Sequence, residues 1–199
     1  MKRLAMSICI LLSISAFAQP TEQITVSAQQ DSIVYTVNGE TSAIANTDMA
    51  AYYLSQGIAS AIEGDYTGAE SKFKVGLLYD LENAEILYNL GLAQYYLEKF
   101  EEAIKTFDAA ADYDPENKDI YNQRGLCKAR SGLLQEAEMD FKIMLKYDPT
   151  FAMGNYNYGI LKLQMGEQEM ACELLNKADQ YGYENAPAVI ATYCNGFDN

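Results

Sequence analysis

The chain offers few side chains that could perform chemistry. It contains no histidine, which is the commonest general base and metal ligand. It has no G-x-S-x-G nucleophile motif, no phosphate-binding glycine loop and no C-x-x-C pair. Asp112, Asp114 and Glu116 offer the oxygen ligands that calcium prefers, but they fall at a turn between two apolar segments. We interpret them as solvated turn residues, and we expect no catalytic residue, metal or cofactor.

The first eighteen residues have the form of a signal peptide. Lys2 and Arg3 make a basic start, residues 4–17 are an apolar run, and Ala16, Phe17 and Ala18 form a small-x-small cleavage site. The apolar run is too short for a permanent membrane span. The sequence therefore predicts export to the periplasm or the medium, with no membrane insertion after cleavage.

Net charge limits the partners that we expect. Without Lys2 and Arg3 the chain keeps 12 basic and 28 acidic side chains, a net charge of −16. Nucleic acid and anionic membranes would repel such a surface, so neither is predicted as a partner. Solubility is the simplest interpretation of the charge, and attraction of a basic partner is the alternative.

The remaining segments repeat with a period of 34 residues. Four residue types recur without gaps: glycine at Gly57, Gly91, Gly125 and Gly159, alanine at Ala69, Ala103, Ala137 and Ala171, a large apolar residue at Phe73, Phe107, Phe141 and Leu175, and tyrosine at Tyr79, Tyr113, Tyr147 and Tyr181. Within each period, the apolar spacing predicts two amphipathic helices joined by a short turn.

This pattern resembles the tetratricopeptide repeat (TPR) family. The second period, "AEILYNLGLAQYYLEKFEEAIKTFDAAADYDPEN", matches the family pattern at Leu90, Gly91, Ala103, Phe107, Ala110 and Pro115, and the third matches at Tyr121, Gly125, Gly132, Ala137, Phe141 and Pro149. The first period departs from it at Gly76 and Leu81, and the fourth has no terminal proline. The resemblance implies an all-α fold, a right-handed TPR superhelix (an α-solenoid) of about four helix-turn-helix repeats.

We therefore divide the chain into a signal peptide at 1–18, an N-terminal extension at 19–47 and a TPR domain at 48–199. The repeats are expected at about 50–83, 84–117, 118–151 and 152–183, and a capping helix with Asn185 as its candidate cap at about 185–195. The tail resembles those of small exported TPR proteins of Bacteroidota-like bacteria.

The N-terminal extension contains two β-prone runs, 24–28 and 32–37, and a turn signal at Asn38 and Gly39. A β-hairpin is one interpretation, and a flexible lead is the other. Residues 41–47 are interpreted as a linker, with Thr47 or Asp48 capping the first helix.

A surface stripe on the first helices of the second, third and fourth repeats is the candidate site. It lies apart from the packing positions and consists of Tyr88, Leu92, Tyr95, Tyr96, Asn122, Leu126, Arg130, Tyr156 and Ile160. In TPR proteins this face lines the concave groove, so the resemblance implies binding of a peptide segment or a partner helix. The alternative is that some of these residues pack against neighbouring helices. A TPR clamp for a C-terminal carboxylate is not expected, because only Asn122 and Arg130 are of suitable type.

The predicted function is thus that of an exported protein–protein interaction module, an adaptor or scaffold, and not of an enzyme. The alternative is an accessory subunit of a cell-envelope assembly that docks by its convex or terminal surfaces. Thiol-redox and small-ligand-binding roles are lesser alternatives.

Three cysteines follow the predicted signal peptide: Cys127, Cys172 and Cys194. An oxidising compartment permits disulfides, and an odd count leaves at least one thiol unpaired unless it bonds another chain. Cys172 begins the second helix of the fourth repeat and Cys194 ends the capping helix, which should fold back onto it. We hypothesise a disulfide between them, with a redox role as the alternative, and a small buried thiol at Cys127.

Overall fold

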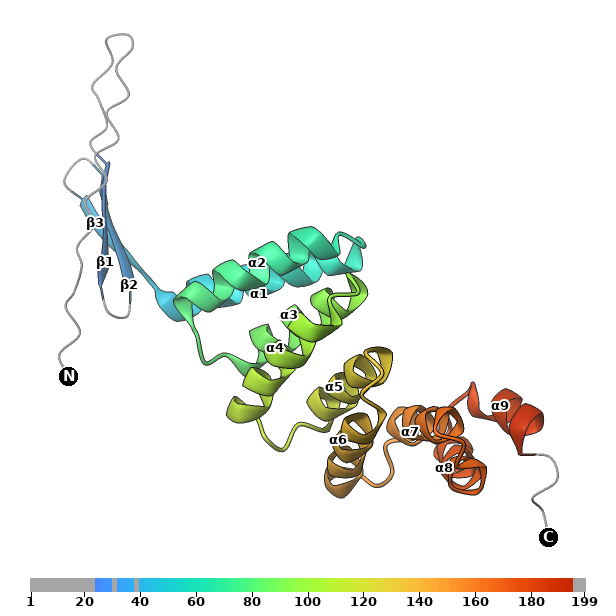
Figure 1. Cartoon of the computed structure of the whole chain (residues 1–199). Helices are drawn as coiled ribbons and strands as arrows, with labels where there is room; N and C mark the ends of the chain where they lie inside the picture. Colours follow the sequence, from blue (N-terminus) through green and yellow to red (C-terminus); the bar gives the residue numbers. More distant parts are fainter. Residues whose placement is uncertain (1–23, 30–31, 38–39, 195–199) are drawn as a thin grey trace.

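The computed structural model describes residues 24–29, 32–37 and 40–194 of the chain. Within these ranges a small β-sheet is followed by a row of antiparallel helix pairs (Figure 1). The pairs are α1 (Asn46–Ile62) with α2 (Tyr66–Tyr79), α3 (Ala84–Tyr96) with α4 (Phe100–Tyr113), α5 (Lys118–Arg130) with α6 (Leu134–Tyr147), and α7 (Ala152–Gln164) with α8 (Gln168–Gln180). Each pair packs on the next, so the predicted all-α solenoid of four repeats is confirmed.

The repeated glycines allow the two helices of a pair to approach closely. A Cβ atom added to Gly91 would lie 2.6 Å from Cε1 of Phe107, and one added to Gly159 would lie 2.9 Å from Cγ of Leu175. Phe107 is fully buried, as are its equivalents in the first and third pairs, Phe73 and Phe141. The recurrence of glycine and a large apolar residue every 34 residues therefore reflects one packing contact that is repeated in each pair.

Left-handed backbone marks the turn inside each pair. Gly64, Gly132 and Gly166 have φ angles of 82°, 79° and 81°, values that glycine adopts without steric cost. The second pair has Glu98 at this position, with φ at 59°. Its amide donates to the carbonyl of Tyr95 at 2.9 Å, so the turn keeps the same form with a less suitable residue.

Aspartate and asparagine side chains shape the connections between pairs. The Nδ2 of Asn117 donates to Oδ2 of Asp114 at 2.9 Å, and its Oδ1 accepts from the amide of Asp119 at 3.1 Å. Asn83 makes the same contact with Asp80 and caps α3 by accepting from the amide of Ile86. The aspartate thus holds the turn, and the asparagine begins the next helix.

Ion pairs also join successive pairs of helices. Lys99 lies 2.7 Å from Glu70 across the first joint, and Arg124 lies 2.7 Å from Asp108 across the second. Lys162 lies 2.8 Å from a carboxylate of α6 across the third. Glu70 and Glu138, the carboxylate of α6, occupy the same position of the repeat, but their partners Lys99 and Lys162 do not, so the period alone does not predict these contacts.

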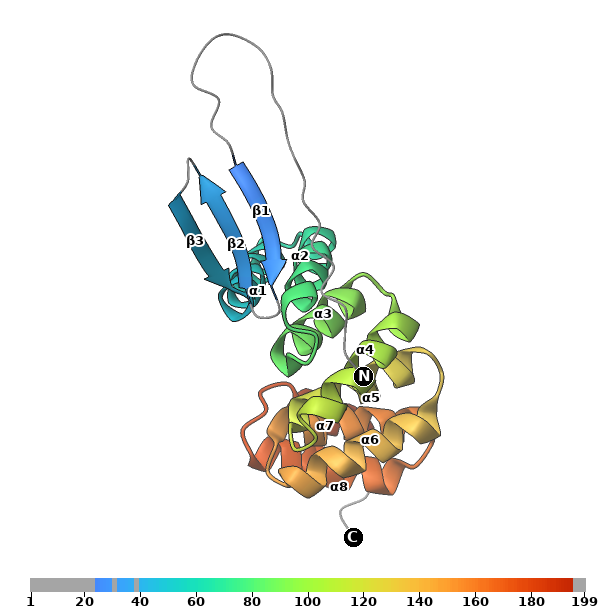
Figure 2. The ribbon, with the colours of Figure 1, turned by 90° about the vertical axis from the view of Figure 1, so that its left-hand side faces the viewer.

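The N-terminal extension forms a three-stranded antiparallel sheet of β1 (Ile24–Gln29), β2 (Ser32–Val37) and β3 (Glu40–Ala45), in that order (Figure 2). The two β-prone runs are strands, as the hairpin interpretation predicts. The linker expected at 41–47 is wrong, because most of it is the third strand. The predicted turn at Asn38 and Gly39 lies outside the described residues.

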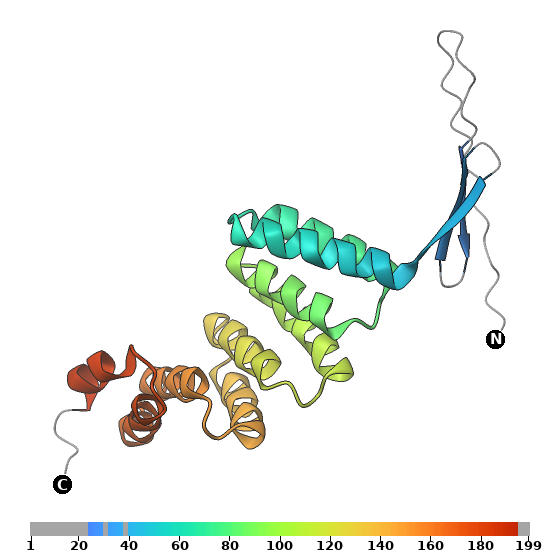
Figure 3. The ribbon, with the colours of Figure 1, turned by 180° about the vertical axis from the view of Figure 1, so that it is seen from behind.

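The sheet leads directly into the solenoid. Strand β3 ends at Ala45 and α1 begins at Asn46, so neither Thr47 nor Asp48 is the cap of this helix, and Ala45 at the cap position makes no side-chain bond. Viewed from behind, the sheet projects beyond the first helix pair (Figure 3).

The short helix α9 (Ala186–Tyr193) closes the other end by packing on α8. Asn185 occupies its N-cap position, but the side chain makes no capping hydrogen bond there. Val189 and Ile190 are half-buried and pack against the buried cluster of Cys172, Leu175 and Cys194. No helix among the described residues is both long and apolar enough to cross a membrane.

Candidate functional site

The predicted stripe lies on α3, α5 and α7, the first helices of three successive pairs. These helices are in contact with one another in order along the solenoid. The stripe is only partly open to solvent. Tyr96 is 56% exposed and Ile160 is 37% exposed, and Arg130 is also exposed. Tyr88, Leu92, Tyr95, Leu126 and Tyr156 are half-buried, so each of them shows solvent only part of its surface.

Tyr88 packs against the core of its own repeat. Its ring centroid lies 6.0 Å from that of Phe107. Burial raises the pKa of Tyr88 to about 12, with a smaller contribution from the charge of Asp119, although a hydrogen bond with Gln123 opposes the rise. The hydroxyl therefore stays protonated, and Tyr88 is a rigid, neutral part of the stripe.

Tyr95 and Tyr96 belong to a group of rings at the turn end of the first two pairs. Tyr66 and Tyr96 stack with centroids 4.6 Å apart, Tyr95 meets Tyr96 edge-on at 5.5 Å, and Tyr95 meets Phe100 at 5.7 Å. We call Tyr66, Tyr95, Tyr96 and Phe100 the aromatic cluster. Sequence reasoning missed Tyr66 and Phe100, although both stand directly after a predicted turn, where side chains of neighbouring repeats can meet.

Asn122 does not line the surface as expected. It is fully buried between α5 and α7, where its Oδ1 accepts from Nδ2 of Asn157 at 3.0 Å. Its own Nδ2 has no hydrogen-bond partner among the described residues. The period places Asn122 in line with Tyr88 and Tyr156, but the shorter side chain lies inside the joint between helices. It is a packing residue and not a surface contact.

Tyr156 is partly covered from the end of the solenoid. Its ring centroid lies 4.5 Å from that of Tyr183, in the loop before α9, and burial raises the pKa of Tyr156. Ile160, one turn further along α7, remains exposed. The stripe is thus open at Tyr96, Arg130 and Ile160 and lined by half-buried apolar side chains between them.

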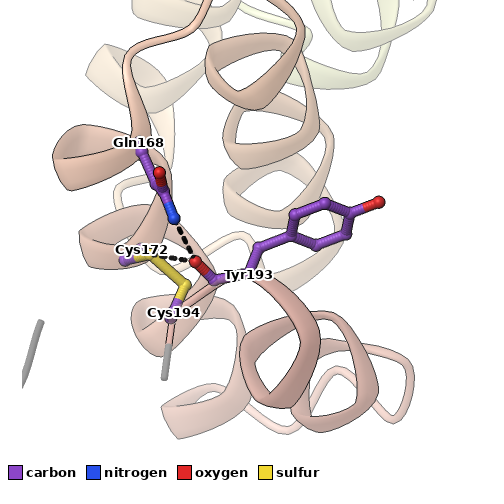
Figure 4. The surroundings of a disulfide bond; sticks show 4 residues. All are labelled: Gln168, Cys172, Tyr193 and Cys194. Atoms are coloured by element: carbon purple, nitrogen blue, oxygen red, sulfur yellow. Dashed lines mark hydrogen bonds between the residues drawn. A yellow bond between two sulfur atoms is a disulfide. The ribbon is translucent and has the colours of Figure 1, made fainter. Parts of the chain in front are cut away.

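The cysteines occupy two different environments. Cys172 of α8 and Cys194 after α9 form a disulfide (Figure 4). Beside it, Nε2 of Gln168 donates to the carbonyl of Tyr193, which ties the end of α9 to α8 a second time. Cys127 is free and fully buried, and burial raises the pKa of its thiol to about 12. A neutral buried thiol is a poor nucleophile, which agrees with a packing role.

The acidic turn shows no metal site. Asp114 is engaged with Asn117, while Asp112 and Glu116 are exposed. Within the part of the chain that the structure describes, no group of three or more acidic or cysteine side chains is arranged to hold a metal ion.

The sequence and the fold of the chain were compared with those of known proteins. Residues 88–150 match the family described as Tetratricopeptide repeat. None of the curated proteins matches the chain.

Many solved structures share the fold. YrrB, described as a TPR protein with an unusual peptide-binding site, is 27% identical, with a TM-score of 0.63 over 72% of this chain and 74% of its own. MamA is 22% identical, with a TM-score of 0.66 over 75% of this chain and 83% of its own. The first TPR of Spaghetti (RPAP3), solved with the HSP90 peptide SRMEEVD, is 20% identical, with a TM-score of 0.59 over 60% of this chain and 95% of its own. The helix pairs, their packing contact and these structures agree that the solenoid has the tetratricopeptide repeat fold, and residues 88–150 match that family.

Proposed function

We propose that the chain is an exported interaction module that holds a peptide segment or a partner helix along its first-helix face. The observation that carries the proposal is the stripe itself. Tyr96 on α3 and Ile160 on α7 are exposed, and half-buried Leu92 and Leu126 lie on α3 and α5. Apolar and aromatic surface that successive helices present in a row is typical of binding sites.

The rigidity of the stripe favours binding. Tyr88 packs against Phe107, and Tyr95 packs against Phe100, so these side chains lose little freedom when a partner binds. YrrB has an unusual peptide-binding site and the first TPR of RPAP3 binds an HSP90 peptide, which is consistent with a peptide as the partner here. Export is supported by the form of residues 1–18 and is part of the proposal.

The test is site-specific photo-cross-linking in the native host. A photoreactive amino acid placed at Ile160 on α7 should cross-link a partner protein, and one at Met139 on α6 is the matched control, because Met139 is 58% exposed on a second helix. In parallel, Leu92→Gln with Leu126→Gln, made in the chain that carries the photoreactive residue at Ile160, should reduce recovery of the cross-linked partner about tenfold, as expected for two interface contacts worth together about 1.4 kcal/mol.

The control variant Met139→Gln with Met170→Gln changes two exposed residues of second helices and should leave the partner unaffected. Circular dichroism shows whether each variant keeps its helices. Cross-linking at Met139 but not at Ile160 would reject the first-helix face and favour docking by the opposite surface.

A further inference from the structure

Beyond a partner along the first-helix face, we infer that the aromatic cluster receives a basic side chain of that partner, an arginine or a lysine. The inference rests on the proposed function, because Tyr95 and Tyr96 belong both to the stripe and to the cluster. It adds the chemistry of the partner at one defined point.

The cluster presents open ring surface at the turn end of the first two pairs. In Figures 1 and 3 the α1–α2 turn and the α3–α4 turn lie side by side. Tyr96 is 56% exposed although it stacks on Tyr66, and Ile62 at the end of α1 is 82% exposed. Rings that are fixed by neighbouring rings and still exposed are well prepared to bind a flat or cationic group.

Three acidic residues stand in the two turns that carry these rings. Asp65 directly precedes Tyr66, Glu63 lies in the same turn, and Glu98 lies two residues after Tyr96. All three are exposed, and none of them forms an ion pair with another described residue. The turn end therefore carries three exposed carboxylates without an ion-pair partner among the described residues, of which Asp65 also accepts from the amide of Gly68 at 2.9 Å as the cap of α2.

The lysines near the cluster are already engaged. Lys99 lies 2.7 Å from Glu70 and Lys74 lies 2.6 Å from the same carboxylate. The ammonium of Lys72 donates to Oγ of Ser60 at 2.5 Å. No ion pair among the described residues joins a cation to Glu63, Asp65 or Glu98, so a basic side chain of the partner can pair with them.

A basic side chain satisfies both features of the surface. A cation over an exposed ring gains about 0.5–1 kcal/mol, and more when water is excluded. A carboxylate beside the ring adds charge complementarity, and the net charge of −14 on the whole chain draws a basic partner toward it. A purely apolar side chain would cover the rings but leave the carboxylates without compensation, so we commit to the basic one.

The experiment measures binding of three fluorescein-labelled peptides to the chain by fluorescence anisotropy. The peptides GSRLARLSG, GSQLAQLSG and GSELAELSG differ only in the charge of two side chains. We expect the arginine peptide to bind about tenfold more tightly than the glutamine peptide, and the glutamate peptide to bind most weakly.

Variants assign this preference to the cluster. Tyr96→Ala should lower the affinity for the arginine peptide about fivefold, and Glu63→Gln with Glu98→Gln should lower it by a similar factor. Tyr113→Ala removes a tyrosine of comparable exposure (48%) elsewhere, and Asp112→Asn with Glu116→Gln removes the same charge at another turn. Neither control should change the affinity by more than about twofold.

Equal binding of the three peptides, no binding of any, or an arginine preference that the controls reduce as much as the cluster variants would each overturn the inference. These outcomes leave the cross-linking at Ile160 untouched, so failure of the basic contact is distinguishable from failure of the proposed function.

Discussion

Lys162 and Glu138 form an ion pair across the joint between the third and fourth repeats, with 2.8 Å between Nζ and Oε1. The Lys162 side chain is 2% exposed and that of Glu138 is 16% exposed, so water screens the pair little. The same ammonium lies 2.8 Å from Glu167, and Glu138 also accepts from the hydroxyl of Tyr158 at 3.0 Å. One lysine of α7 thus fixes how the fourth repeat sits on the third.

Removing this cation should destabilise the chain strongly. We expect Lys162→Met to lower the free energy of unfolding by about 3 kcal/mol, because a carboxylate that is mostly buried loses its most buried partner. Urea denaturation followed by circular dichroism measures the change. Lys142→Met is the matched control, since Lys142 contacts the same carboxylate at 2.7 Å but is 62% exposed. This control should cost less than about 1 kcal/mol, and equal losses in the two variants would contradict the importance of burial.

The same network predicts a dependence on acid. Hydrogen bonds from Lys142 and Lys162 lower the pKa of Glu138 to about 2, from an ordinary value of 4.5. Because the folded pKa lies below the unfolded one, the stabilisation is fully present above the unfolded value. It is lost as the pH falls from there toward the folded value.

We therefore expect the stability difference between the native chain and Glu138→Gln to shrink as the pH is lowered from neutrality through about pH 4.5 toward the folded pKa. Urea denaturation at a series of pH values measures it. A difference that stays constant over this range would show that Glu138 titrates normally in the folded chain.

The repeat was predictable from the sequence because its packing contact uses few residue types. Gly91 and Phe107 must recur together, since a larger residue at the first position would collide with the ring of the second. This requirement lies inside each repeat and does not depend on solvent or on a partner, so it appears in the sequence as a regular period. The four helix pairs follow from it.

The third strand was not predictable in the same way. Glu40–Ala45 contains threonine, serine and alanine with a single large apolar residue, and its own β-propensity is weak. It forms because it pairs with β2, where Tyr35 lies opposite Ser42 and Val37 lies opposite Glu40. Pairing between strands is a tertiary effect that a local pattern does not contain.

The site was predicted only as a face and not in detail. The period placed Asn122 on the stripe because it counts positions and ignores side-chain length, whereas the structure buries this residue. The period also could not find Tyr66, because its contact with Tyr96 joins a second helix to the first helix of the next repeat. Contacts across a joint depend on how repeats stack, and no single repeat encodes that.

The disulfide should matter most for the end of the chain. Cys172 and Cys194 are 22 residues apart, and closing a loop of this length stabilises the folded state by about 3 kcal/mol. We expect Cys172→Ser with Cys194→Ser to lower the melting temperature and to make amides of α9 exchange faster with solvent than those of α5. Thermal denaturation and hydrogen exchange measure the two effects.

A reductant provides the control for this prediction. It should destabilise the native chain to the level of the double variant and leave the double variant unchanged, while Cys127→Ser should retain its sensitivity to reduction. Unchanged exchange in α9 after loss of the disulfide would mean that the contacts of Val189 and Ile190 alone hold the helix.

The turn at Glu98 offers a substitution that should stabilise the chain. A residue with a Cβ atom pays about 1–2 kcal/mol for left-handed backbone, whereas glycine does not, and glycine gives back about 0.5–1 kcal/mol through the greater freedom of the unfolded chain. Glu98→Gly should therefore raise the free energy of unfolding by about 0.5–1 kcal/mol, measured by urea denaturation. Glu98→Gln removes the same charge and keeps the strain, so it should have little effect. Equal stability of the two variants would show that the backbone of this turn is not strained.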